Sequence, residues 1–388
     1  MPIISRMVEF HDLLTGWRRD LHANPQTAFE ETYASDFIAA RLQEFGLRVH
    51  RGLAKTGVVG TLEGSKPASG ELSAVGLRAD IDALDVQEEN DLAYKSQHPG
   101  KMHACGHDGH TAMLLGAAKY LAERRNFAGT VHFIFQPAEE NEGGGRVMVE
   151  EGLFDEFPVD AVFGMHNWPG MPAGEFAVTS GPIMAAYDVF EIVIRGTGAH
   201  GAMPHQGIDP IVVAAHVVTA LQTIASRNTD PMDRIVVTVS QIHAGDTWNV
   251  IPSEATLRGT TRTFRESVQD MVEAKMGQIV AGVCDALGAE SEFRYERRYP
   301  ATVNTEQESR WAAEVAGQVV GPDKVVRDPA PHMGSEDFAF MLRERPGSYI
   351  WIGNGTDAAG VHNSRYDFND EILPIGASYW ARLVETLM

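Results

Sequence analysis

The chain has 388 residues, 44% of them hydrophobic, which is more than one hydrophobic core usually organises, so we expect two domains. Its 53 acidic and 32 basic side chains give a formal net charge of −21, which disfavours binding to nucleic acid or to anionic membranes. Two cysteines, Cys105 and Cys284, exclude a disulfide framework and suit a reducing compartment, so the sequence predicts a cytoplasmic protein. Charges interrupt the N-terminal apolar pattern, and no apolar run of about 18 residues is expected to span a membrane.

Residues 1–185 alternate helical segments with short β-rich runs, among them GVVGTLEG, SAVGLRADI, TVHFIFQ and DAVFGMH. This alternation predicts an α/β domain with a mixed, largely parallel sheet. The last two runs are continuously apolar, as is typical of central strands that are covered on both faces.

Residues 186–298 have a different pattern, with the order strand, helix, strand, strand, helix, strand. This order is that of a ferredoxin-like α+β domain. From residue 299 the α/β pattern returns, with a helix near 308–320, a strand SYIWIG and a terminal helix near 372–387. We therefore predict one domain made of residues 1–185 and 299–388, interrupted by an inserted domain of residues 186–298.

The densest cluster of reactive side chains is MHACGHDGHT, residues 102–111. Cys105 and His107 stand two residues apart, so in extended backbone a thiolate and an imidazole share a face and can reach one metal centre. Alternatively, Cys105 is a buried loop residue beside the start of a helix that has Asp108 near its N-cap. A cysteine nucleophile with His107 as its base is a third interpretation, although such close neighbours are poorly placed for a base that a third group must orient.

Further candidate ligands follow predicted strands. Glu139 and Glu140 come directly after TVHFIFQ, where adjacent carboxylates diverge, so one can bind metal while the other faces a water. His166 ends the next apolar strand, which brings it to the same sheet edge, and His362 lies in the loop before the terminal helix. The alternatives are that Glu139 and Glu140 belong to a solvated acidic turn and that His166 is a core histidine. Together, five residues offer sulfur, nitrogen and oxygen ligands for two cations: Cys105, His107, Glu140, His166 and His362.

These motifs resemble those of the M20 metallopeptidase family, in its amidohydrolase branch of hippurate hydrolases, N-acyl-amino-acid amidohydrolases and auxin-conjugate hydrolases. The similarity runs through nearly the whole chain, from WRRDLHANPQTAFEE through LRADIDALDV, MHACGHDGHT, FQPAEE, GMHNWP, GAHGAMPHQGIDP, NVIPSEATLRGTTRTF and MGSEDFAF to VHNSRYDFND. The resemblance implies a zinc-peptidase-like catalytic domain with an inserted lid or dimerisation domain, and a homodimer.

The resemblance also implies that Cys105 bridges two divalent cations at a position that an aspartate fills in other branches. The other four candidates complete the ligand set, and Glu139 becomes the general base. Asp80 stands where other branches carry a metal-ligating histidine, so we do not count it as a ligand. A thiolate favours Zn, whereas carboxylate and imidazoles also suit Mn, Co or Ni.

The sequence alone predicts that His200 and His205 are turn residues in a glycine-rich loop. The resemblance implies that His200, from the partner subunit's lid, stabilises the oxyanion, and it leaves His205 open. It also places Asn249, Arg262 and Gly334 in motifs that line the substrate cleft, with Arg262 as a partner for a substrate carboxylate.

The expected activity is hydrolysis of the amide bond of a small N-acyl amino acid, of the hippurate or N-acetyl type. The alternative is a non-catalytic dimeric binder of amino-acid conjugates. A missing ligand or base would favour that alternative, and none is missing from the motifs.

Overall fold

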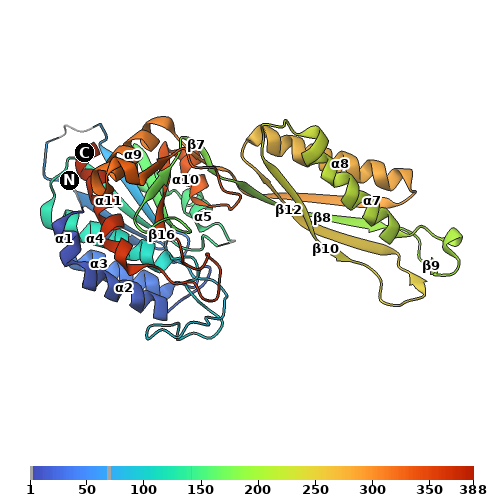
Figure 1. Ribbon diagram of the computed structural model, residues 1–388, viewed down its shortest axis with the longest axis horizontal. Coiled ribbons are helices and arrows are strands. Elements are labelled where there is room, and N and C mark those ends of the chain that lie inside the picture. The colour runs from blue at the N-terminus through green and yellow to red at the C-terminus, as the bar shows by residue number, and fades with distance from the viewer. Residues whose placement is uncertain (1–2, 68–70, 141) are drawn as a thin grey trace. The chain divides into compact units, whose positions relative to one another are not determined.

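The computed structural model describes residues 3–67, 71–140 and 142–388 and divides the chain into two compact units (Figure 1). The first comprises Met1–Ile183, Val303–Ala330 and Asp337–Met388, and the second comprises Met184–Thr302 and Pro331–Glu336. One boundary was wrong, because the segment with Gly334 belongs to the second unit. There the Ala185 N–H donates to the carbonyl oxygens of His332 (3.0 Å) and Gly334 (2.9 Å), which ties the segment to the first strand of that unit.

A mixed eight-stranded sheet forms the centre of the first unit. Its strands are β1 (Arg48–Arg51), β2 (Val58–Glu63), β3 (Ala74–Asp80), β4 (Thr130–Gln136), β5 (Ala161–Pro169), β6 (Phe176–Val178), β15 (Val325–Arg327) and β16 (Gly347–Gly355). They lie in the order β1-β2-β4-β3-β5-β16-β6-β15. The central pairs β4/β3, β3/β5 and β5/β16 are parallel, whereas β1/β2, β2/β4 and β16/β6 are antiparallel. The expected mixed, largely parallel α/β sheet is confirmed.

Helices surround this sheet (Figure 1). They are α1 (Ser5–Glu9), α2 (His11–Ala23), α3 (Thr32–Glu44), α4 (His107–Arg124), α5 (Gly144–Glu150), α6 (Leu153–Glu156), α9 (Glu306–Val320), α10 (Phe338–Glu344) and α11 (Leu373–Leu387), with short turns η3 (Pro322–Lys324) and η4 (Asp370–Ile372). α4 contacts β3 on one side and α2 and α11 on the other, so it is buried nearly all round and has no polar face. Its first residue, His107, is thereby held at the end of a rigid element.

The second unit contains β8 (Ala186–Arg195), α7 (Pro210–Thr223), β10 (Ile235–His243), β12 (Glu254–Thr263), α8 (Glu266–Ala286) and β13 (Glu290–Tyr299). The four strands form an antiparallel sheet in the order β10-β12-β8-β13. Both helices cover one face of it (Figure 1), because alternate residues of β8 and β12 are apolar and buried against them. Short pairs complete the chain: β7 (Gly181–Met184) with β14 (Thr302–Asn304), and β9 (Ala199–His200) with β11 (Val250–Ile251), beside the turn η1 (Pro204–Gln206).

One apolar stretch is longer than expected. α7 continues into a π-helical turn, η2 (Ile224–Asn228), and the resulting 19-residue stretch, Pro210–Asn228, has the length and the mean hydropathy, 1.2, of a membrane span. The expectation that no such stretch occurs was therefore wrong. Val213, Val217 and Leu221 nonetheless pack in the core of the second unit, and core helices meet the same criteria, so the support for a membrane span is weak.

Candidate metal centre

The polar residues that follow β4, end β5, precede α4 and precede η4 converge in the first unit. Among the described residues, five groups have ligand atoms within 4.8 Å of one another, and three of them consist only of predicted site residues: Cys105, His107 and His166; Cys105, Glu140 and His362; and His107, Glu139 and Glu140. The fold thus brings together side chains that lie as far apart in the sequence as Cys105 and His362.

Local backbone geometry explains this convergence. Gly106, between the first two candidates, has φ +94°, and a Cβ there would lie 2.3 Å from the Asn167 side-chain nitrogen, so only glycine fits. His362 also has a left-handed backbone, with φ +63°. Its N–H donates to the Ala104 carbonyl at 2.7 Å, which fixes the His362 loop to the loop that carries Cys105.

The first unit leaves two buried ligand atoms without a hydrogen bond, namely His107 Nε2 and Glu140 Oε1. The latter lies 3.0 Å from His362 Nε2 without the geometry of a hydrogen bond. Burial opposes a charge on His107, but the carboxylates of Asp80 and Asp82 outweigh it and raise the pKa of His107 to about 10. The position therefore favours positive charge, which a metal cation would supply.

Cys105 and His166 offer the remaining donors, 3.3 Å apart from Sγ to Nε2. The His166 Nδ1 donates to the Asn167 carbonyl at 2.6 Å, which leaves Nε2 with a lone pair toward the site. Burial lowers the pKa of His166 well below its usual value, so the imidazole is neutral, as a ligand must be. Burial and the carboxylate of Glu140 raise the pKa of the Cys105 thiol, so its thiolate needs a bound cation. The donor set thus fits divalent metals.

The other predicted site residues lie in the second unit. His200 on β9 faces Val250 on β11, next to Asn249, whose carbonyl accepts the Gly201 N–H at 2.7 Å. His200 Nδ1 accepts the Ala202 N–H at 3.0 Å, so Nε2 is the nitrogen that can donate.

Arg262 on β12 lies with its guanidinium 4.1 Å from the centre of the Tyr187 ring and donates to Ser335 Oγ at 3.1 Å. Within the described part of the chain it forms no ion pair with a carboxylate, and Asp188 acts on it at longer range. Gly334 lies next to Ser335, and a Cβ at Gly334 would come within 2.8 Å of the His332 ring. Arg262, Ser335 and Gly334 thus form one neighbourhood of the second unit.

Comparison with known proteins agrees with the geometry. The sequence matches the family described as peptidase family M20/M25/M40 over residues 76–386. It is 39% identical to hippurate hydrolase of Campylobacter jejuni, over 99% of this chain and 98% of that protein. It is 38% identical to N-acetylcysteine deacetylase of Bacillus subtilis, over 96% of each chain. The chain belongs to peptidase family M20/M25/M40.

The structure of this M20 chain also resembles a solved member of the family. The Bacillus subtilis YXEP protein, described as a dinuclear metal-binding peptidase, superposes with a TM-score of 0.84 at 35% identity, over 97% of this chain and 98% of that one. The resemblance drawn from the motifs is thereby confirmed. Hydrolysis and metal binding are the properties that this family membership and the converging ligand groups support.

Sequence reasoning missed the residues that support the ligands of this M20 site. Asp82 Oδ1 lies 3.1 Å from His107 Nδ1, whereas Asp80 Oδ1 lies 2.6 Å from Nδ1 of a second histidine, His110. His110 Nε2 accepts the backbone N–H of Asn167 at 2.9 Å. Asp82 is visible in the motif LRADIDALDV, but it stands only two residues from Asp80. Only the fold shows that Asp82 lies at Nδ1 of His107, whereas Asp80 Oδ2 lies 3.8 Å from its Nε2.

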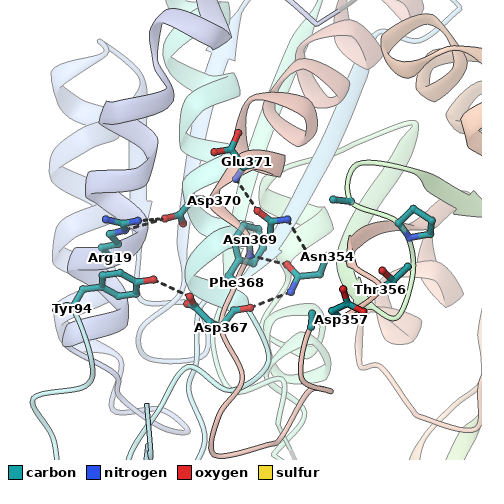
Figure 2. A pocket seen from close by; sticks show the side chains of 14 residues that line it. Arg19, Tyr94, Asn354, Thr356, Asp357, Asp367, Phe368, Asn369, Asp370 and Glu371 are labelled. Carbon is teal, nitrogen blue, oxygen red and sulfur yellow. Dashed lines mark hydrogen bonds and ion pairs between the residues drawn. The ribbon is translucent and has the colours of Figure 1, made fainter. Parts of the chain in front are cut away.

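A cavity of about 680 Å³ in the first unit of this M20 chain contains none of the predicted site residues. Figure 2 shows Arg19 directed at Asp370 and Tyr94 directed at Asp367, with nitrogen-to-oxygen and oxygen-to-oxygen distances of 2.9 and 2.8 Å. These two contacts engage four of the polar side chains that line the cavity, and none of the four is a candidate metal ligand.

Proposed function

We propose that this chain hydrolyses the amide bond of N-acyl amino acids, of the N-acetyl or hippurate type, at a centre of two divalent cations. The observation that carries the proposal is the convergence of a thiol, imidazoles and carboxylates around two buried atoms, His107 Nε2 and Glu140 Oε1, that lack hydrogen bonds. The names of the relatives support the substrate class, because hippurate and N-acetylcysteine are both N-acyl amino acids.

Five residues would hold the cations: Cys105 as the bridging ligand, with His107, Glu140, His166 and His362. When bound, two divalent cations polarise the acyl carbonyl and lower the pKa of a water molecule. A site that mixes thiolate, imidazole and carboxylate suits Zn, Mn, Co or Ni.

Glu139 acts as the general base in this proposal. Its side chain is 7% exposed, and one of its oxygens lies within 4.8 Å of ligand atoms of His107 and Glu140. A carboxylate there can accept the proton of the attacking water and pass it to the leaving nitrogen. Glu139 has no ligand role in this scheme, and its role is to move the proton.

The second unit would complete the site in a homodimer. We assign His200, from the partner subunit, to the oxyanion, since its Nε2 can donate and its side chain is exposed. Arg262, which forms no ion pair in the described part of the chain, would bind the substrate carboxylate, with Asn249 and Gly334 lining the same cleft. Ile211 and Val212, both exposed at the start of α7, offer apolar surface for such a dimer in the cytoplasm.

The test is a screen of N-acetyl, benzoyl and indole-acetyl amino acids with protein that has been stripped of metal and reloaded with each cation. We expect no turnover without metal and turnover that returns with at least one of the four cations. Binding of metal and of an acyl amino acid by calorimetry, with no turnover of any substrate, would instead favour the non-catalytic binder.

A further inference from the structure

Glu31, the residue that precedes α3, is fully buried in the first unit, and its carboxylate ends among three separate turns. Oε1 accepts the backbone N–H groups of Ala138 and Phe29, both at 3.0 Å. Oε2 accepts the hydroxyl of Thr56 at 2.6 Å. One buried carboxylate therefore ties together segments that lie up to 107 residues apart in the chain.

These turns share an uncommon backbone conformation. Phe29 has φ +61°, Ala54 and Lys55 have φ +47° and +66°, and Ala138 has φ +53°. Residues other than glycine rarely adopt such backbone angles, so the surrounding structure must hold these residues in that conformation. The turns at Phe29 and Ala138 each donate a backbone N–H to Glu31, and the turn at Ala54 and Lys55 adjoins Thr56, whose hydroxyl also donates to Glu31. Glu31 thus stabilises all three turns.

The turn at Ala138 matters most because Glu139 follows it directly. The Ala138 carbonyl accepts the Gly144 N–H at 2.9 Å, and the Glu140 N–H donates to Asp82 Oδ2 at 2.9 Å. The backbone that presents Glu139 is therefore held by one buried carboxylate on each side, Glu31 at the preceding residue and Asp82 at the following one. Asp82 also contacts His107, whereas the hydrogen bonds of Glu31 involve no candidate ligand.

We propose that Glu31 is a positioning residue for Glu139: its carboxylate holds the left-handed turn at Ala138 that directs the base toward the metal centre. The inference rests on the proposed function of Glu139. It also explains why a carboxyl group is buried here with neutral hydrogen-bond donors around it. Burial, with the charge of Asp82, raises the pKa of Glu31 to about 7, and hydrogen bonds from the Thr56 hydroxyl and from the backbone at Glu31 and Phe29 lower it in part.

The variants that test this role differ in how many of the three hydrogen bonds they can still accept. Glu31→Met keeps the length and fills the buried volume but removes every acceptor. Glu31→Gln keeps an oxygen for the two N–H groups, and its amide nitrogen can donate to Thr56 once that hydroxyl reverses its role. Glu151 supplies a matched control, because its Oε2 accepts the Ala54 N–H at 2.6 Å in the same set of turns but does not reach Ala138.

We expect Glu31→Met to lower kcat by about 10–100-fold, since a displacement of about 1 Å in a catalytic group can cost roughly 100-fold. KM and metal content should stay near wild type, because neither ligands nor substrate-binding residues contact Glu31. Glu31→Gln should recover most of the lost kcat, and Glu151→Ala should keep it. Equal losses in the methionine and glutamine variants, an unchanged kcat in Glu31→Met, or metal loss in proportion to activity would overturn the proposal.

Amide hydrogen exchange gives a readout that does not depend on turnover. The peptide containing Ala138 and Glu140 should exchange faster in Glu31→Met than in wild type, and at the wild-type rate in Glu151→Ala. If the wild type hydrolyses no acyl amino acid, the proposed function fails, but the exchange measurement still tests whether Glu31 holds the turn at Ala138. Unchanged exchange in Glu31→Met would contradict the positioning role of Glu31 even if the enzyme is active. Should Glu31→Met fail to fold, Glu31→Asp, which withdraws the same carboxylate by one methylene, takes its place in both measurements.

Discussion

The carboxylate of Asp82 lies 3.1 Å from Nδ1 of His107 and accepts the backbone N–H of Glu140 through its other oxygen at 2.9 Å. One side chain thus orients two neighbouring candidate ligands. An asparagine could satisfy only one of these partners, because its amide nitrogen cannot accept a hydrogen bond. Asp82→Asn should weaken metal affinity by about 10–100-fold, measured by competition with a chelator. Asp85→Asn, at an exposed carboxylate nearby, is the control, and equal affinities in both variants would contradict the role of Asp82.

Cys105 provides a second prediction. Burial and the carboxylates of Glu140 and Glu139 disfavour its thiolate, so bound cations must stabilise it. Cys105→Ser should lower metal occupancy, measured by elemental analysis after dialysis, before it changes the thermal unfolding of the protein. Full metal content together with full activity in this variant would show that Cys105 does not bridge the cations.

Glu139→Gln should retain both metals and lower kcat by at least about 100-fold, because an amide cannot accept the proton of the attacking water. Steady-state kinetics and metal analysis of the same preparation provide the measurement. If metal content falls in step with kcat, the roles of Glu139 and Glu140 are exchanged.

The proposed dimer predicts complementation between two inactive chains. If His200 acts across a two-fold axis, a His200→Ala chain paired with a Glu139→Gln chain forms one site with both lesions and one with neither. Random exchange of the two inactive homodimers should then restore roughly a quarter of the wild-type activity per chain. Subunit exchange is verified by mass labelling. Mixtures that exchange but stay inactive would show that His200 works within its own chain or has no catalytic role.

His22 predicts a pH dependence of stability. Burial opposes its protonation, but Asp108, at 2.8 Å from Nδ1, and Glu88, at 3.4 Å from Nε2, outweigh burial and raise its pKa to about 9. The folded pKa lies above the unfolded value of about 6.5, so this stabilisation is complete below about pH 6.5 and is lost as the pH rises through 9. The stability difference between wild type and His22→Gln should therefore shrink on the order of 3 kcal/mol over this range in urea unfolding. A difference that does not change with pH would contradict the assignment.

The pair of His22 and Asp108 shows contacts that the sequence did not indicate. The sequence predicts Asp108 near the N-cap of the helix, and it lies two residues after the N-cap Gly106, where its Oδ1 accepts the Gly109 N–H at 2.9 Å. Its Oδ2 lies beside His22 and the buried Arg18, 3.1 Å from Arg18 Nε. A cap is a local feature that any nearby aspartate can suggest. The partners of the Asp108 carboxylate, His22 and Arg18, lie on α2, more than 80 residues earlier in the chain, and no local pattern indicates them.

The sequence by itself determined the strands, the helices and the candidate ligands of this protein. Apolar runs such as TVHFIFQ form central strands because only burial on both faces satisfies them, and parallel strands bring the residues that follow them to one edge. Glu139, Glu140 and His166 could therefore be predicted to converge. Tertiary structure alone decided that Asp82 lies at Nδ1 of His107, that Gly334 belongs to the second unit, and that Glu31 reaches the turn at Ala138. These choices depend on contacts between distant segments, and hydrophobic pattern and local propensity carry no information about which polar groups will meet when those segments pack.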